Sequence, residues 1–289
     1  LYRLDPDGHQ IWKTRTYGHQ PRDYETGKVK EILVTPLQSD GPPVILAGAD
    51  NWHLSAFTLD GEELWHCWYY SHSTTFITTG DIDGDGVKEI FQGTSFADTN
   101  WFDARGEESH FQRPRIGPAA DGVTADLDAD GKDEMIAVGQ KGVAAMTVVA
   151  GEEPRAWDDR VEWRIDTGCP QTSVVVADVD GNGVDDIVTA GKNGFIWAVG
   201  EGGGVHWVRN AGNSINDLVI ADLDRSGKSA ILAASDDGSV QVWSLNGRLL
   251  RRINIGVQVV KTAVADIDGD GNQEIVAVTI DNILHAVRP

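Results

Sequence analysis

The segment GDIDGDGVKEI, from Gly80 to Ile90, carries aspartates at three alternate positions, a glycine directly after the third, and a glutamate three residues further on. Four other segments align with it without gaps: ADLDADGKDEM from Ala125, ADVDGNGVDDI from Ala177, ADLDRSGKSAI from Ala221 and ADIDGDGNQEI from Ala265. Their first aspartates, at positions 81, 126, 178, 222 and 266, are 45, 52, 44 and 44 residues apart. A recurring period of this length indicates a repeated supersecondary unit.

Each acidic segment lies between two apolar stretches rich in β-branched residues, such as TSVVVADVD before one loop and EIVAVT after another. A turn of Gly, Asn or Asp follows, then an alternating stretch such as SVQVWSL, a second turn, and a stretch such as GRLLRRI. Four short strands in one repeat, separated by turn residues, are typical of a propeller blade. The sequence therefore predicts an all-β chain, a β-propeller of four-stranded antiparallel blades.

The number of blades follows from the number of repeats. A sixth, degenerate copy, PLQSDGPPVIL from Pro36, keeps only the pair Asp40 and Gly41. We therefore expect a single propeller domain over residues 1–289 with six blades, at roughly 28–70, 72–113, 117–167, 170–210, 213–255 and 257–289. The last blade ends after its third strand, and we expect an N-terminal strand at 8–14 to complete it beside the strand near Ile283. Because Tyr2 to Leu4 also has a strand pattern, seven blades are the alternative.

The acidic loops have the spacing of a calcium site. Calcium is a hard cation that takes about six to eight oxygen ligands. Alternate side chains of a tight loop converge, so positions one, three, five and nine supply carboxylates, position seven supplies a backbone carbonyl, and the glycine at position six permits the turn. We expect Ca²⁺ in four loops, with the ligand sets Asp81, Asp83, Asp85, Val87 and Glu89; Asp126, Asp128, Asp130, Lys132 and Glu134; Asp178, Asp180, Asn182, Val184 and Asp186; and Asp266, Asp268, Asp270, Asn272 and Glu274.

The remaining loops have weaker ligand sets. In the loop from Asp222, Ser226 stands at position five and Ala230 at position nine, so we expect weak binding or none. The loop from Pro36 is expected to bind nothing. The site recurs from blade to blade, whereas a catalytic metal is usually unique and keeps an open position in its coordination shell. We therefore expect the ions to have a structural role.

These loops resemble the FG-GAP repeats of integrin α-subunit propellers and the repeats of bacterial secreted VCBS-type propeller proteins, over roughly residues 30–289. The resemblance implies the propeller fold and calcium, but not one activity, because such propellers include adhesion modules, lectins and polysaccharide lyases. The loops and the DG-x-x-LW stretch ending at Trp65 are also similar to rhamnogalacturonan-lyase-type propellers. The tryptophans that follow hairpin turns resemble those of quinoprotein-like repeats, but the Thr-Gly pair of that signature is absent. We therefore expect packing between blades from Trp12, Trp65, Trp163 and Trp207.

A ligand surface is expected at the strand ends opposite the calcium loops. The connections at those ends are rich in aromatic and polar residues in the first two blades, whereas later blades have short turns such as GQKG, GKNG and SDDG. Aromatic rings stack on the apolar faces of sugars, and polar neighbours hydrogen-bond the hydroxyl groups. The residues we expect to bind ligand are Trp52, His53, Tyr69, Tyr70, His72 and Trp101.

Composition limits the function classes. The chain has 24 basic and 45 acidic residues and a net charge of −21, which opposes binding to nucleic acid or anionic membranes. It has no apolar run of the length that membrane insertion needs. We interpret the chain as a non-catalytic binding module for a carbohydrate or a protein, in an extracellular, cell-surface or periplasmic setting.

An enzyme, specifically a polysaccharide lyase or hydrolase, is the alternative. A lyase needs a base for the proton beside a uronate carboxylate and a cation to neutralise that carboxylate. Residues of the right types on the ligand-side connections are His19, Arg22, His53, Tyr69, Tyr70, His72, Arg113 and Arg115. Nothing in their spacing demands that chemistry.

Overall fold

The computed structural model describes residues 1–16, 27–69, 72–96, 99–107, 109–147 and 161–288. Within those residues every regular element is a β-strand except one short 3₁₀ turn, η1 (Glu201–Gly203). The chain divides into two compact units. The first comprises Leu1–Thr124, Gly131–Ala137 and Ala145–Glu162, and the second comprises Ala125–Asp130, Val138–Ala144 and Trp163–Pro289.

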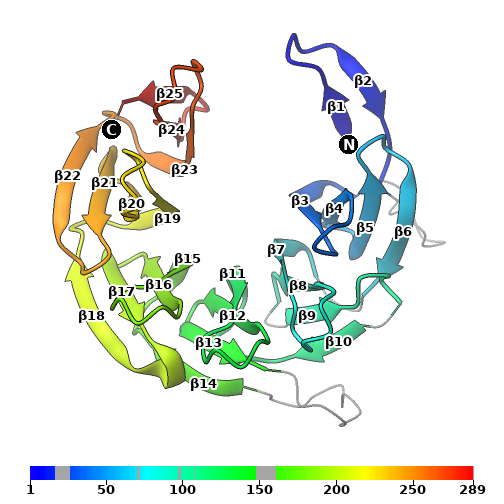
Figure 1. Ribbon diagram of the computed structural model, residues 1–289, viewed down its shortest axis with the longest axis horizontal. Helices are drawn as coiled ribbons and strands as arrows, with labels where there is room; N and C mark the ends of the chain where they lie inside the picture. Colours follow the sequence, from blue (N-terminus) through cyan, green and yellow to red (C-terminus); the bar gives the residue numbers. More distant parts are fainter. Residues whose placement is uncertain (17–26, 70–71, 97–98, 108, 148–160, 289) are drawn as a thin grey trace. The chain divides into compact units, whose positions relative to one another are not determined.

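The first unit contains a hairpin and two four-stranded antiparallel sheets (Figure 1). The hairpin pairs β1 (Tyr2–Leu4) with β2 (Gln10–Lys13). The first sheet consists of β3 (Val29–Pro36), β4 (Pro43–Ala49), β5 (His53–Thr58) and β6 (Glu63–Trp68). The second sheet consists of β7 (Thr74–Gly80), β8 (Glu89–Thr94), β9 (Thr99–Phe102) and β10 (Ser109–Gln112).

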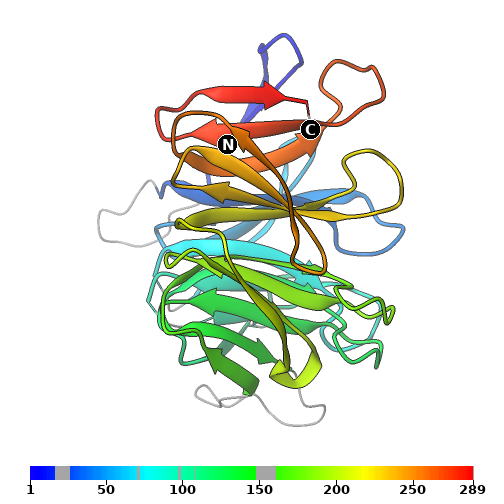
Figure 2. The same cartoon turned by 90° about the vertical axis from the view of Figure 1, so that its left-hand side faces the viewer.

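A third sheet contributes strands to both units: β11 (Ala119–Ala125), β12 (Glu134–Gly139), β13 (Gly142–Met146) and β14 (Val161–Asp166). The second unit continues with two four-stranded sheets. Their strands are β15 (Gln171–Ala177), β16 (Asp186–Gly191), β17 (Phe195–Val199) and β18 (Val205–Asn210), and then β19 (Ile215–Ala221), β20 (Ala230–Ser235), β21 (Ser239–Ser244) and β22 (Leu249–Asn254). The last sheet has three antiparallel strands, seen from the side in Figure 2: β23 (Val259–Ala265), β24 (Glu274–Thr279) and β25 (Leu284–Val287).

The prediction of an all-β chain of four-stranded antiparallel sheets is confirmed. The described residues form seven sheets, of which five have four strands, one has three and one has two. The expected count of six is not confirmed, because β1 and β2 form a sheet of their own, and seven sheets match the alternative. Pairing of β2 with the strand near Ile283 would join the two units, and it stays a prediction.

Neighbouring sheets bury their apolar faces against each other. In the first unit, β3 and β4 pack against β7, and the cluster between these sheets includes Leu46, Leu54, Ile90 and Phe102, all without exposed surface. In the second unit, β15 and β16 pack against β19, and β19 and β20 pack against β23. A sheet with two apolar faces can only be stable between two neighbours, so the repeat forms its core across sheet boundaries.

A tryptophan on the outer strand of one sheet packs on the hairpin turn of the next. Trp207 of β18 is 9% exposed, and its indole Nε1 donates a hydrogen bond of 3.0 Å to the carbonyl of Leu245. The ring lies over Gly247, where an added Cβ would come within 2.9 Å of it. The predicted packing role is therefore confirmed for Trp207. Equivalent indole bonds join Trp12 to Leu59 (2.9 Å) and Trp65 to Ala104 (3.1 Å).

This contact makes a glycine-to-alanine comparison informative. Gly247 and Gly256 have φ of +78° and +89°, so alanine at either costs about 1–2 kcal/mol of backbone strain. Only Gly247→Ala also pushes a methyl group into Trp207, which adds about 1–3 kcal/mol of overpacking, since Gly256 has no atom within 4 Å of the added Cβ. Urea unfolding should therefore rank Gly247→Ala below Gly256→Ala in stability. Equal losses in the two variants would show that the ring does not pack on the turn.

Candidate metal centres and an aromatic surface

The loop between β7 and β8 folds its acidic side chains around a common centre. Asp81 accepts backbone hydrogen bonds from Gly84 (2.8 Å) and Gly86 (2.9 Å) on its two oxygens. Asp83 accepts one from the amide of Asp85 (3.1 Å). Asp81, Asp83 and Asp85 each offer a carboxylate oxygen, and these oxygens all lie within 4.8 Å of one another. The predicted convergence of alternate aspartates is thus present in this loop.

Left-handed backbone at position six recurs in all five acidic loops. The five glycines at this position have φ between +80° and +90°, a region that favours glycine over every residue with a Cβ. This conformation turns the chain back so that the ninth residue can begin the next strand. The glycines are Gly86, Gly131, Gly183, Gly227 and Gly271.

The carboxylate at position nine is buried in each of the four loops that have one. The residues are 3–5% exposed and are Glu89, Glu134, Asp186 and Glu274. One oxygen of Glu89 accepts the amide of Ile82 at 2.9 Å. Burial raises the pKa of Glu89 to about 7, and the charges of Asp83 and Asp85 also raise it. A carboxylate held in this position is costly unless a cation or a proton neutralises it.

In the Asp266 loop a cation of the chain itself reaches the acidic side chains. Arg288 donates hydrogen bonds to Asp268 (3.0 Å) and Asp270 (3.1 Å), and its Nε lies 3.8 Å from Glu274 Oε1. That buried oxygen receives no hydrogen bond, while Glu274 Oε2 accepts the amide of Ile267 at 3.1 Å. The guanidinium shows that this loop collects positive charge, and a metal ion there would have to displace it.

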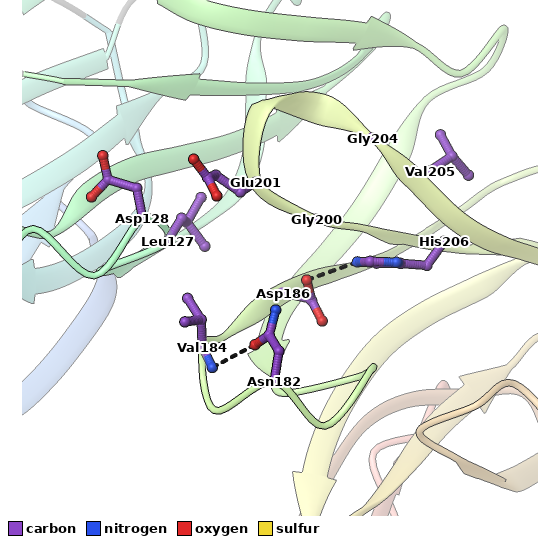
Figure 3. A pocket seen from close by; sticks show the side chains of 10 residues that line it. All are labelled: Leu127, Asp128, Asn182, Val184, Asp186, Gly200, Glu201, Gly204, Val205 and His206. Carbon is purple, nitrogen blue, oxygen red and sulfur yellow. Dashed lines mark hydrogen bonds and ion pairs between the residues drawn. The ribbon is translucent and has the colours of Figure 1, made fainter.

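The Asp178 loop has the same framework with one addition, a histidine (Figure 3). Asp178 accepts the amides of Gly181 (2.7 Å) and Gly183 (2.9 Å), as Asp81 does in its own loop. Asp186 Oδ2 accepts the amide of Val179 at 2.9 Å. Asp186 Oδ1, the other oxygen, lies 2.9 Å from Nε2 of His206 on β18. Sequence spacing did not reveal this histidine, because it is twenty positions from Asp186.

The other two loops differ from each other in the carboxylates that they bring together. Asp126, Asp128 and Glu134 offer ligand atoms within 4.8 Å of one another. In the Asp222 loop the two aspartates accept backbone amides in the same way, but Ala230 fills position nine. The degenerate first loop has no such carboxylates, and its Leu37 carbonyl accepts the amide of Lys88 at 2.8 Å.

The structure separates the six residues expected to bind ligand. Tyr69 is 1% exposed, and its hydroxyl lies 2.7 Å from Thr74 Oγ1. His53 is 3% exposed, and its Nδ1 lies 2.9 Å from the carbonyl of Asn51. Burial raises the pKa of Tyr69 to about 12. These two side chains pack in the interior and offer no surface to a ligand, while Tyr70 lies outside the described residues.

Trp101 also differs from its expected place. It stands near the end of β9, not in the connection before it, because β9 already begins at Thr99. It lines a cavity of about 540 Å³ together with Asp83, Asp85 and Glu89, at the acidic-loop end of its sheet. Trp101 therefore does not share a surface with Trp52 and His72, which lie at the opposite strand ends.

An exposed aromatic surface does exist at those opposite ends, and we define it as Trp52, Trp68, His72 and Phe96. The ring of Trp52 lies 6.3 Å from that of Trp68 and 5.7 Å from that of His72, centroid to centroid. His72 stacks on Phe96 at 4.6 Å. The exposed fractions of Trp52, Trp68 and Phe96 are 36%, 45% and 56%. Sequence analysis missed Trp68, although it begins the aromatic run WYY.

Of the residues considered for a lyase, His19, Arg22 and Tyr70 lie outside the described parts of the chain. His53 and Tyr69 are buried. His72 stands in the aromatic surface, stacked on Phe96.

Comparison with known proteins gives the fold. No family model matches the chain, and no curated protein sequence matches it. Solved structures do match. One is BBS1N in complex with ARL6DN, with a TM-score of 0.64 and 8% identity over 89% of this chain and 78% of that one. Another is Chaetomium thermophilum Sqt1 bound to the N-terminus of ribosomal protein L10, with a TM-score of 0.68 and 13% identity over 91% of this chain and 72% of that one.

This chain has the β-propeller fold. A third similar structure is the V. cholerae biofilm matrix protein Bap1, with a TM-score of 0.63 and 19% identity; the match covers 88% of this chain and 43% of Bap1. Identities this low show the fold alone. Among the described residues, no helix has the length and apolar character to cross a membrane.

The stability of two variants tests whether the backbone of Trp52 is strained. Its φ of +68° costs a bulky residue about 1–2 kcal/mol. Trp52→Gly removes this strain together with ring contacts worth about 0.5–1.5 kcal/mol, so its stability should stay close to that of the parent. Trp52→Ala loses the contacts and keeps the strain, and urea unfolding should find it less stable than Trp52→Gly. The reverse order would remove the argument for strain at this residue.

Proposed function

We propose that this chain is a calcium-stabilised propeller that acts as a non-catalytic binding module and presents its aromatic surface to a carbohydrate. The observation that carries the proposal is the division between the two ends of the sheets. Buried carboxylates gather in the acidic loops at one end, and exposed rings gather at the other. The first end would bind structural ions, and the second would contact the ligand.

The acidic loops fit calcium in chemistry and arrangement. All their predicted ligands are oxygens, as a hard cation requires. In the Asp81 loop, the converging aspartates and the buried Glu89 with its raised pKa describe a site that gains from a divalent ion. In the Asp266 loop the buried Glu274 Oε1 has no hydrogen-bond donor, which supports the same reading. We assign calcium to the loops that begin at Asp81, Asp126 and Asp266, where it would cross-link the ends of two strands.

Calcium removal should lower stability, and one substitution in one of the three loops should reproduce part of the effect. Asp83 is exposed, so Asp83→Asn removes a ligand charge without disturbing the core. Calcium at a hundredfold excess over its dissociation constant stabilises the folded chain by about 2.7 kcal/mol per site. Differential scanning calorimetry should show a higher Tm in calcium than in chelator, and a smaller difference for Asp83→Asn.

Asp40→Asn is the matched control, because Asp40 is an exposed aspartate in the degenerate first loop. Its calcium-dependent rise in Tm should equal that of the parent chain. A parent chain whose Tm is the same in calcium and in chelator would refute the calcium assignment.

Carbohydrate is the ligand class that suits the aromatic surface. Exposed rings on three different connections offer flat apolar faces of the kind that stack on pyranose rings. The strained backbone of Trp52 supports a functional role for that ring. The biofilm matrix protein Bap1 is similar in fold and would share an extracellular setting, where free calcium is high enough for sites of about 10⁻⁴–10⁻³ M affinity. The complexes of BBS1N and Sqt1 with protein partners support a binding role for the fold in general.

A glycan array with the calcium-loaded chain should identify a saccharide ligand, and calorimetry should then measure its affinity. Trp68→Ala and Phe96→Ala should each weaken binding about tenfold, since one stacking contact is worth about 1 kcal/mol or somewhat more. Tyr2→Ala is the control, because Tyr2 is 59% exposed but lies on β1, away from the aromatic surface. Unchanged affinity in both surface variants would exclude this surface as the binding site.

A further inference from the structure

His206 occupies a distinctive place on the outer strand of its sheet. In the pairing of β17 with β18, Ala198 faces Trp207 and Val199 faces Val205, so His206 is the extra residue of a β-bulge. A bulge re-aims the side chain that it carries. In two other sheets the corresponding bulge residue is apolar and exposed, namely Leu64 (50%) and Leu250 (48%).

The bulge directs the imidazole at the acidic loop of its own sheet. His206 Nε2 lies 2.9 Å from Asp186 Oδ1, and the side chain of Asp186 is 4% exposed. The other Asp186 oxygen accepts the amide of Val179, as the position-nine carboxylates of other loops accept the amide at position two. The oxygen that faces His206 is therefore the one that points into the loop.

A third ligand completes the group. Asp180 at position three, Asp186 and His206 each offer one atom, and these atoms lie within 4.8 Å of one another. One oxygen of Asp180 accepts the amide of Asn182 at 3.0 Å, which fixes the orientation of the carboxylate. The loop also has one carboxylate fewer at its predicted ligand positions, because Asn182 stands where the Asp81 loop has Asp85, and its carboxylate at position nine belongs to the shorter Asp186 instead of a glutamate.

Two carboxylates and an imidazole are ligands for a first-row transition metal rather than for calcium. Calcium takes oxygen ligands in flexible shells, whereas imidazole suits zinc, copper, iron and nickel. With metal–nitrogen and metal–oxygen bonds of about 2.0–2.2 Å, two ligands at about 90–110° lie about 2.8–3.6 Å apart. The separation of His206 Nε2 from Asp186 Oδ1 is 2.9 Å, at the near edge of that range.

We propose that Asp180, Asp186 and His206, in the loop from Asp178 whose sequence predicts calcium, instead form a binding site for a zinc-type divalent transition metal. The ion takes the place of the hydrogen bond between His206 Nε2 and Asp186 Oδ1, and a neutral imidazole that binds the ion through Nε2 carries its proton on Nδ1. Asn182 lies beside the group and completes its polar lining.

The surroundings of the site leave room for the imidazole and for the ion. At Gly200 an added Cβ would come within 2.5 Å of His206 Nε2, so a side chain at this position would displace the ring. Asp186 and His206 line a cavity of about 340 Å³ whose walls also include Glu201, Gly204 and Val205 (Figure 3). The turn after β17 therefore combines glycine at the point of closest approach with an opening that admits an ion.

The test is a zinc titration of the full chain in a calorimeter, after the chain has been treated with chelator. The parent should bind zinc at this site with a dissociation constant that rises at least tenfold in His206→Leu and in Asp180→Asn. Leucine is the residue that two other sheets carry at the same bulge, so His206→Leu should fold. Asp180 is exposed in its loop, so Asp180→Asn tests the site without a change on β18.

His9→Leu is the matched control. Asp5, Asp7 and His9 form the other histidine-containing group among the described residues whose ligand atoms lie within 4.8 Å of one another. Zinc affinity should be unchanged in this variant. Cobalt(II) gives a second readout, because a nitrogen ligand alters its visible absorption, and the parent spectrum should be lost in His206→Leu.

The outcomes separate this proposal from the calcium assignment. His206→Leu should keep the calcium-dependent rise in Tm, which comes from the other loops. Loss of zinc binding in His206→Leu supports the site whether or not calcium stabilises the chain. Equal zinc affinity in the parent and His206→Leu, zinc binding lost only in His9→Leu, or a parent that binds no zinc would each overturn it.

Discussion

The concentration of negative charge in the acidic loops is the constraint on which the rest of this structure depends. A buried carboxylate and three aspartates share one small loop, held in place by backbone amides and by a left-handed glycine. The same arrangement recurs along a chain of net charge −21. Like charges this close repel strongly unless a proton or a cation neutralises them. The raised pKa of Glu89 and the position of Arg288 are two responses to this one constraint.

The loops are coupled to the packing of the sheets in the first unit. The amide of Asp133 donates to the carbonyl of Asp81 at 2.8 Å, and an oxygen of Asp133 accepts the amide of Asp81 at 2.8 Å. The amide of Lys88 makes a similar bond to Leu37 in the loop before it. An ion that orders one loop therefore also orders the contact between its sheet and the next. At the outer strands, the tryptophan packed on a glycine turn also joins one sheet to the next, through van der Waals contact instead of charge.

Sequence spacing predicted the strands beside the loops well, because the aspartate and glycine positions impose a fixed local geometry. β7 ends at Gly80 and β8 begins at Glu89, where the motif places them. The aromatic residues were harder to predict, since a ring at the end of a strand or in the connection that follows can point outward like Trp68 or inward like Tyr69, and only the packing decides. The predicted place of Trp101 was wrong because the polar residues Asp98, Thr99 and Asn100 have the composition of a loop, whereas β9 already begins at Thr99. His206 could not be linked to Asp186 from spacing, because the link depends on a bulge in β18.

The central claim is that the acidic loops are cation sites, and the most direct test is to count the ions. Chelator-treated chain should be titrated with calcium in a calorimeter, at ionic strength high enough to suppress weak surface binding. The account predicts at least three calcium ions per chain, one for each of the loops that begin at Asp81, Asp126 and Asp266. A chain that takes up no calcium at millimolar free concentration would contradict it.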